Sequence, residues 1–140
     1  MRAKILIVDD DPDIRLSLQN RITFMGHDPV TALDGKEALR LIQEEEPDLV
    51  LLDLELPLLS GLDILKHVRN SSAPHNALED ETPQTPGTHT TPLIVILTAY
   101  GTVERAVQAM QLGAYDFVPK PFTADHLTVV VNKALATIAL

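Results

Sequence analysis

The segment from Leu49 to Pro57 constrains the fold of this chain most strongly. It opens with four aliphatic residues and then places Asp53 where the apolar run would otherwise continue. Four consecutive aliphatic residues are typical of a short strand that is buried on both faces, as in a parallel sheet. Because an unpaired buried charge is very costly, we expect Asp53 to lie at the end of this strand, facing water, a metal ion or a cationic group.

The N-terminal segment repeats this pattern. Residues Ile5 to Val8 form a second uninterrupted aliphatic run, which ends in three consecutive aspartates, Asp9 to Asp11. Pro12 suits the first position of a helix, with Asp11 as its N-cap. An aspartate after a strand is also common as a plain helix cap, and this reading of Asp53 stays open when that residue is considered alone.

Strand and helix signals alternate five times along the chain. The expected strands are 4–8, 28–32, 49–53, 93–97 and 115–118, and the expected helices begin at residues 12, 36, 62, 103 and 123. The fourth helix carries Val103, Ala106, Val107 and Met110 as its apolar residues. This alternation predicts an α/β fold, a doubly wound five-stranded parallel sheet with right-handed crossovers and strand order 2-1-3-4-5.

The segment from Asn70 to Thr91 interrupts this regularity. It follows a third helix expected to end at Arg69, and it is rich in polar residues and proline with almost no aliphatic side chains. Such a composition cannot bury enough apolar surface to order itself. We therefore expect one domain over residues 1–140, with a flexible surface insertion at 70–91 that begins at the end of the third helix.

Composition narrows the possible functions. The net charge of −9 argues against direct contact with nucleic acid, because phosphate backbones are bound by basic surfaces. The absence of cysteine excludes disulfides, zinc–thiolate sites and cysteine nucleophiles. The first residues lead into an apolar run that is too short for a signal peptide or a membrane span. We therefore expect a cytoplasmic protein without a membrane segment.

Polar side chains follow four of the expected strands. In the order 2-1-3-4-5, the sheet reverses its winding between the first and third strands, and ligands bind at such a point. These two strands end in Asp9, Asp10 and Asp53, and Thr98 and Lys120 follow the fourth and fifth strands. Considered together, the five side chains favour a functional site over five separate structural roles.

The chemistry of these side chains indicates phosphoryl transfer. Three clustered carboxylates need a cation, and a site with only oxygen ligands favours Mg²⁺. Lys120 can pair with Asp53 or with a phosphate oxygen, and Thr98 offers a hydroxyl donor. The chain has no Gly-x-x-x-x-Gly-Lys-Ser/Thr loop to hold a nucleotide, which leaves Asp53 as the expected phosphoryl acceptor.

These motifs resemble those of response-regulator receiver domains over nearly the whole chain. The matching elements are Val8-Asp9-Asp10, Asp53 with Pro57 and Gly61, Thr98-Ala99, and Lys120-Pro121-Phe122. Residues 98–122 most resemble the receivers of NtrC-type transcriptional activators. In those proteins, an ATPase domain and a DNA-binding domain follow the receiver. We therefore expect a fragment of a longer regulator, with a stand-alone receiver as the alternative.

The resemblance implies a role for each site residue. Asp53 would accept a phosphoryl group from the phosphohistidine of a sensor histidine kinase. Asp10, Asp53 and the backbone carbonyl of Glu55 would bind Mg²⁺, and Asp9 would act mostly through water. Thr98 and Lys120 would contact the phosphoryl group, and the Lys120–Pro121 peptide bond would be cis.

The resemblance also implies a switch rather than a turnover enzyme. Phosphorylation would draw Thr98 inward, and Phe117 would turn into the vacated space, although Phe117 can also be read as a plain core aromatic. The face of the fourth helix, fifth strand and fifth helix would be remodelled, most often into a homodimer surface. Glu55 and Tyr100 occupy positions that tune the lifetime of the phosphate in this family, and we expect Tyr100 to hinder the attacking water.

Two other functions remain open at this stage. The first is an aspartyl phosphatase of the haloacid-dehalogenase type, faintly suggested by the acidic pair Asp53 and Glu55. The usual place of that nucleophile on the first strand and the lack of a cap domain speak against it. The second is a degenerate receiver that only binds a partner, which the presence of all five site residues disfavours.

Overall fold

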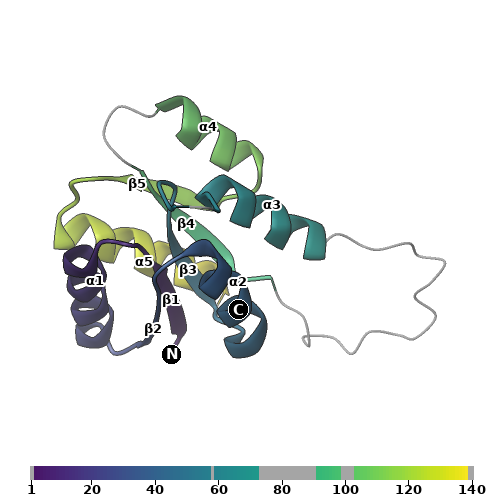
Figure 1. Ribbon diagram of the computed structural model, residues 1–140. Helices are drawn as coiled ribbons and strands as arrows, with labels where there is room; N and C mark the ends of the chain where they lie inside the picture. The colour runs from purple at the N-terminus through teal and green to yellow at the C-terminus, as the bar shows by residue number, and fades with distance from the viewer. Residues whose placement is uncertain (1, 58, 73–90, 99–102, 139–140) are drawn as a thin grey trace.

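The computed structural model describes residues 2–57, 59–72, 91–98 and 103–138 (Figure 1). Strands and helices alternate along these ranges, as the sequence predicts. The strands are β1 (Lys4–Val8), β2 (Asp28–Ala32), β3 (Leu49–Asp53), β4 (Leu93–Thr98) and β5 (Asp116–Pro119). The helices are α1 (Pro12–Phe24), α2 (Gly35–Glu45), α3 (Gly61–Ser72), α4 (Val103–Gln111) and α5 (Ala124–Ile138).

The five strands form one parallel sheet in the order β2-β1-β3-β4-β5, which confirms the predicted fold class and strand order. β1 lies between β2 and β3, so the direction of winding changes beside β1. The register places Val8 opposite Leu52, and Asp53 opposite Leu97 on β4. Because all strands are parallel, their carboxyl ends meet at one edge of the sheet.

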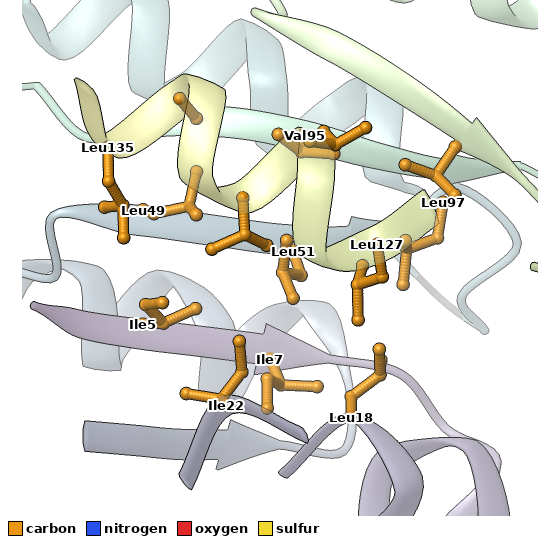
Figure 2. Packing of buried hydrophobic residues seen from close by; sticks show 14 of the residues in the cluster. Ile5, Ile7, Leu18, Ile22, Leu49, Leu51, Val95, Leu97, Leu127 and Leu135 are labelled. Atoms are coloured by element: carbon orange, nitrogen blue, oxygen red, sulfur yellow. The ribbon is translucent and has the colours of Figure 1, made fainter. Parts of the chain in front are cut away.

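Helices cover both faces of the sheet, and a separate apolar core fills each face (Figure 1). Successive side chains of a strand point to opposite faces. Ile5 and Ile7 therefore pack toward α1 and α5, while Leu6 and Val8 pack toward α2 and α3. Figure 2 shows the first core, where residues of β1, β3 and β4 meet Leu18 and Ile22 of α1 and apolar residues of α5. The strands that carry the polar ends are thus anchored on both sides.

Polar caps begin the first two helices. Asp11 accepts hydrogen bonds from the backbone N–H groups of Asp13 (2.9 Å) and Ile14 (3.4 Å), which confirms Asp11 as an N-cap. At the start of α2, Asp34 accepts from the Glu37 N–H, and the Glu37 carboxylate accepts from the Leu33 N–H. The first bond satisfies an N–H group that the first turn of a helix leaves free, and the second ties the residue before the cap to the helix.

The expected end of α3 was wrong, and α4 shows which of its apolar residues are buried. α3 continues to Ser72 instead of ending at Arg69, so residues 70–72 belong to a helix and not to the insertion. Residues 73–90, the rest of the expected insertion apart from Thr91, lie outside the described part of the chain. On α4, Val107 and Met110 are exposed, while Ala106 and Ala109 are buried. The inner face of α4 therefore carries small alanines, and its larger apolar side chains point outward.

Phe117 on β5 is 40% exposed, so its alternative reading as a core aromatic is also wrong. β5 is an edge strand of the sheet, and the next residue, Val118, is the one that enters the core. Since side chains alternate along a strand, Phe117 faces away from that core.

None of the helices in the described ranges combines the length and the apolar character needed to cross a membrane.

Candidate functional site

The carboxyl edge of the sheet holds the five polar side chains that the sequence singled out. Asp9 and Asp10 directly follow β1, and Asp53 is the last residue of β3. Thr98 ends β4, one residue beyond the partner of Asp53 in the sheet, and its carbonyl accepts a 2.7 Å hydrogen bond from the N–H of Lys120. Four strand ends, distant in sequence, therefore bring these residues to one edge.

Asp9, Asp10 and Asp53 form a compact acidic cluster. One carboxylate oxygen from each lies within 4.8 Å of those of the other two. Asp9 and Asp53 are buried, with 0% and 2% exposed, while Asp10 is open to solvent. All the donor atoms are oxygens, which is the ligand set preferred by hard cations that keep part of their water shell. The three carboxylates could thus hold a metal ion, and Asp10 is the one of them that is open to solvent.

Lys120 supplies the positive charge in this cluster. Its Nζ lies 2.8 Å from Asp9 Oδ2 and 3.4 Å from Asp53 Oδ2. Burial lowers the pKa of Lys120, but the hydrogen bond to Asp9 and the charges of Asp53 and Asp9 together outweigh burial and raise that pKa. The sequence suggested Asp53 or a phosphate oxygen as the partner of Lys120, and the structure shows contacts with both Asp53 and Asp9, of which the one with Asp9 is shorter. The Lys120–Pro121 peptide bond is cis, as predicted.

The Asp53 carboxylate is fixed by a hydrogen bond from the loop that follows β3. Its Oδ1 accepts a 2.9 Å hydrogen bond from the Glu55 N–H. Burial is the main cause that raises the pKa of Asp53, and the negative charge of Asp9 adds to it. The Glu55 N–H and Lys120 oppose this shift without cancelling it. The carboxylate is therefore fixed in direction, while its negative charge is incompletely compensated by the protein.

This incomplete compensation predicts that Asp53→Asn stabilises the metal-free domain by about 1 kcal/mol at pH 7. A raised pKa in the folded state means that the contribution of Asp53 is fully present below its ordinary value of 3.8 and is lost as the pH rises through the raised value. Urea unfolding at several pH values checks this. The difference between the two proteins should vanish below pH 3.8, and a less stable Asp53→Asn at pH 7 would contradict the assignment.

Two hydrogen bonds hold Asp9 in place. Asp9 Oδ1 accepts a 2.9 Å hydrogen bond from the Asp11 N–H, and the Asp9 carbonyl accepts one of 2.9 Å from Arg15 Nη1. Arg15 was not among the residues predicted from the sequence to contribute to the site. Its position four residues after the N-cap Asp11 places it on the same side of α1 as the strand end, and this spacing was the available signal.

Gly61 brings the start of α3 against the end of β3. Its N–H donates a 3.3 Å hydrogen bond to the Leu54 carbonyl. A Cβ atom on Gly61 would lie 2.8 Å from both the Asp53 carbonyl oxygen and the Leu54 Cα. Only glycine permits this approach, so the sequence pattern of Asp53, Pro57 and Gly61 has a steric reason.

The sequence analysis also missed Arg105 on α4. Its Nη1 lies 2.6 Å from both carboxylate oxygens of Glu55, and its Nη2 donates to the Leu54 carbonyl at 3.3 Å. Arg105 and Glu55 are 50 residues apart, and no sequence spacing signals their contact. The carbonyl oxygen of Glu55, expected as a metal ligand, has no hydrogen bond within the described part of the chain.

Two further residues stand apart from the cluster. Phe117 lies on β5 with its ring partly exposed, and no interaction in the described residues joins it to Thr98. Tyr100, expected to influence the lifetime of a phosphate, lies outside the described residues.

Comparison with known proteins identifies the family. Residues 5–132 match the response regulator receiver domain. The regulatory protein AtoC of Escherichia coli strain K12 is 36% identical over 132 residues, which cover 94% of this chain and 25% of AtoC. PilR of Pseudomonas aeruginosa is 38% identical over 134 residues, or 96% of this chain and 26% of PilR. A crystal structure of NtrX from Brucella abortus with ADP has a TM-score of 0.81 at 36% identity and covers 98% of this chain and 28% of that one.

These relatives agree with the resemblance to NtrC-type regulators noted for residues 98–122. The chain spans between 25% and 48% of the length of the first three curated relatives. Receiver domains of response regulators are signalling domains and not turnover enzymes. The family match, the strand order and the acidic cluster lead to the same conclusion, that this chain belongs to the receiver-domain family of two-component response regulators.

Proposed function

We propose that this domain is a phosphorylation switch and that Asp53 accepts a phosphoryl group from the phosphohistidine of a sensor histidine kinase. The observation that carries the proposal is the Asp53 carboxylate at the carboxyl edge of the sheet. It is fixed by the Glu55 N–H (2.9 Å) and lies 3.4 Å from Lys120 Nζ, beside two further aspartates. A buried, oriented carboxylate next to a cation is suited to nucleophilic attack on phosphorus.

In the transfer step, an Asp53 carboxylate oxygen forms a bond to phosphorus while the bond from phosphorus to the histidine nitrogen breaks. The bonding electron pair stays on the imidazole, which takes up a proton. Lys120 is placed to move toward a phosphoryl oxygen, because its 3.4 Å contact with Asp53 is the looser of its two ion pairs. The Thr98 hydroxyl, at the end of the neighbouring strand, would donate to a second phosphoryl oxygen.

Mg²⁺ fits the acidic cluster, with Asp10, Asp53 and the Glu55 carbonyl as ligands and Asp9 acting through water or through Lys120. When bound, the ion would neutralise charge that develops on the phosphoryl oxygens. The protein itself provides the fixed carboxylate, the ammonium group and the hydroxyl. Hydrolysis reverses the modification, since water attacks phosphorus and Asp53 leaves as a carboxylate.

The output of the switch would follow from movement of Thr98 and Phe117. We place the response on the face formed by α4, β5 and α5, where Val107, Met110 and Phe117 are already exposed, and we expect this face to form a homodimer after phosphorylation. The relatives' names include transcriptional regulators, so the proposed role is control of transcription in the cytoplasm through a further part of a longer protein. Residues 1–140 would form one receiver domain.

Incubation with acetyl phosphate and Mg²⁺ followed by intact mass measurement tests the proposal. The wild-type chain should gain the mass of one phosphoryl group, and Asp53→Ala should gain none, because the acceptor oxygen is missing. Asp34→Ala is a matched control, since Asp34 is a helix cap at the start of α2 and not a member of the acidic cluster. It should be modified as the wild type is.

The same preparation separates this function from the two alternatives considered above. Steady turnover of small phosphate esters would identify a phosphatase instead. A wild-type chain that remains unmodified in acetyl phosphate and in the presence of a phosphorylated kinase would identify a degenerate receiver and overturn the proposal.

A further inference from the structure

An ion pair outside the acidic cluster connects α4 to the loop that follows Asp53. Arg105 contacts both carboxylate oxygens of Glu55 at 2.6 Å and also binds the Leu54 carbonyl at 3.3 Å. The side chains are 32% and 42% exposed, so the pair is only partly screened by water. Among the described residues, no other basic side chain forms an ion pair with Glu55. Contact with two oxygens and a carbonyl makes Arg105 the group that fixes the Glu55 carboxylate.

Glu55 is in turn joined directly to the phosphoryl acceptor. Its N–H donates to Asp53 Oδ1 at 2.9 Å, so the backbone of Glu55 directly contacts one member of the acidic cluster. That cluster already contains three carboxylates and one ammonium group, and Lys120 contacts Asp9 and Asp53. An unpaired Glu55 would therefore leave a negative charge two residues from Asp53, while Lys120 is already engaged with Asp9 and Asp53.

We propose that Arg105 is a positioning residue for phosphoryl transfer, which neutralises Glu55 and so prevents this carboxylate from repelling an anionic phosphoryl donor. The inference rests on the function proposed above. Arg105 acts through Glu55 and does not itself contact the acceptor. Its effect is electrostatic, because it sets whether the carboxylate of Glu55, two residues from Asp53, repels the donor.

Removing Arg105 should change two measurements in opposite directions. At low ionic strength and saturating Mg²⁺, Arg105→Ala should be phosphorylated by acetyl phosphate about fivefold more slowly, because Glu55 then repels the donor. The same variant should bind Mg²⁺ alone about threefold more tightly in a calorimetric titration, because the added charge attracts a cation. Raising the salt concentration should reduce both effects. Disordering of the loop would instead weaken both reactions and would not depend on salt in this way.

A double-mutant cycle with Glu55→Gln tests the route through Glu55. Glu55→Gln combined with Arg105→Ala should recover the rate that Arg105→Ala loses, because the carboxylate that repels the donor is then gone. Arg105→Lys, which keeps the charge, should recover part of it. Arg40→Ala is the matched control, because it removes the same charge from an exposed ion pair with Glu44 on α2 and should change neither measurement.

The outcomes separate the two proposals. A double variant that is no faster than Arg105→Ala would overturn the inference, as would weaker Mg²⁺ binding by Arg105→Ala or a rate equal to that of the wild type. In each of these cases a phosphorylated wild-type chain leaves the proposed function intact. A wild-type chain that takes up no phosphoryl group would overturn the proposed function and, with it, the role given to Arg105.

Discussion

Replacing Lys120 with methionine should lower the free energy of unfolding by about 3 kcal/mol in metal-free buffer. The ammonium group lies 2.8 Å from Asp9, which is fully buried, and 3.4 Å from Asp53. Its removal leaves two buried carboxylates without a cation, which costs more than the pair contributed. Urea unfolding at pH 7 to 8 measures the full effect. The raised pKa of Lys120 keeps its contribution complete below the ordinary value of 10.5, and that contribution is lost only as the pH rises through the raised value.

Two comparisons show whether this loss comes from the acidic cluster. Mg²⁺ should recover part of the stability of Lys120→Met, because an ion that binds the folded state stabilises it by mass action. Lys4→Met is the control, since Lys4 forms a 3.0 Å ion pair with Glu45 at a half-exposed position. Such pairs contribute less than about 1 kcal/mol. Equal losses in the two variants, or no response to Mg²⁺, would show that Lys120 does not compensate the buried charges.

Gly61→Ala should destabilise the domain by about 2 to 3 kcal/mol and also slow phosphoryl uptake. The new Cβ would lie 2.8 Å from the Asp53 carbonyl oxygen and from the Leu54 Cα. Both are backbone atoms, so they cannot rotate away as a flexible side chain can. The end of β3 must shift, and the Asp53 carboxylate shifts with it. Denaturant unfolding and the acetyl phosphate reaction measure the two consequences.

Gly26→Ala provides the contrast for this steric effect. Gly26 has a φ of +91° and no atom within 4 Å of an added Cβ, so its replacement strains the backbone without a clash. A cost of about 1 kcal/mol is expected, with phosphoryl uptake unchanged in the folded protein. If Gly61→Ala is phosphorylated as fast as Gly26→Ala, the close approach of α3 does not position the acceptor.

The fold and the position of the site could be predicted because both depend on local patterns. Each central strand is a run of aliphatic residues followed by a polar one, and this pattern identifies both the buried strand and its carboxyl end. The alternation with helices predicts a parallel sheet, and the order 2-1-3-4-5 is one of the common orders of such sheets. Asp53, Thr98 and Lys120 could be assigned to one edge because parallel strands share their direction, before any contact was known.

Contacts that depend on the packing of helices could not be predicted in the same way. The pairing of Arg105 with Glu55 requires α4 to lie beside the loop after β3, and no pattern within either segment encodes this. The apolar residues of the fourth helix likewise did not reveal which of them are buried. Ala106 and Ala109 are buried, while the larger Val107 and Met110 are exposed.

The direction of α3 offers a practical route to spectroscopy. The helix starts at the acceptor edge with Gly61, so Asn70, nine residues on, lies about 14 Å away along its axis. The chain contains no cysteine, and Asn70 on the last turn of α3 is exposed. Asn70→Cys would therefore give a single thiol for a fluorescent dye. The fluorescence could report conformational changes of the domain in solution, without the dye contacting the phosphoryl acceptor at the other end of α3.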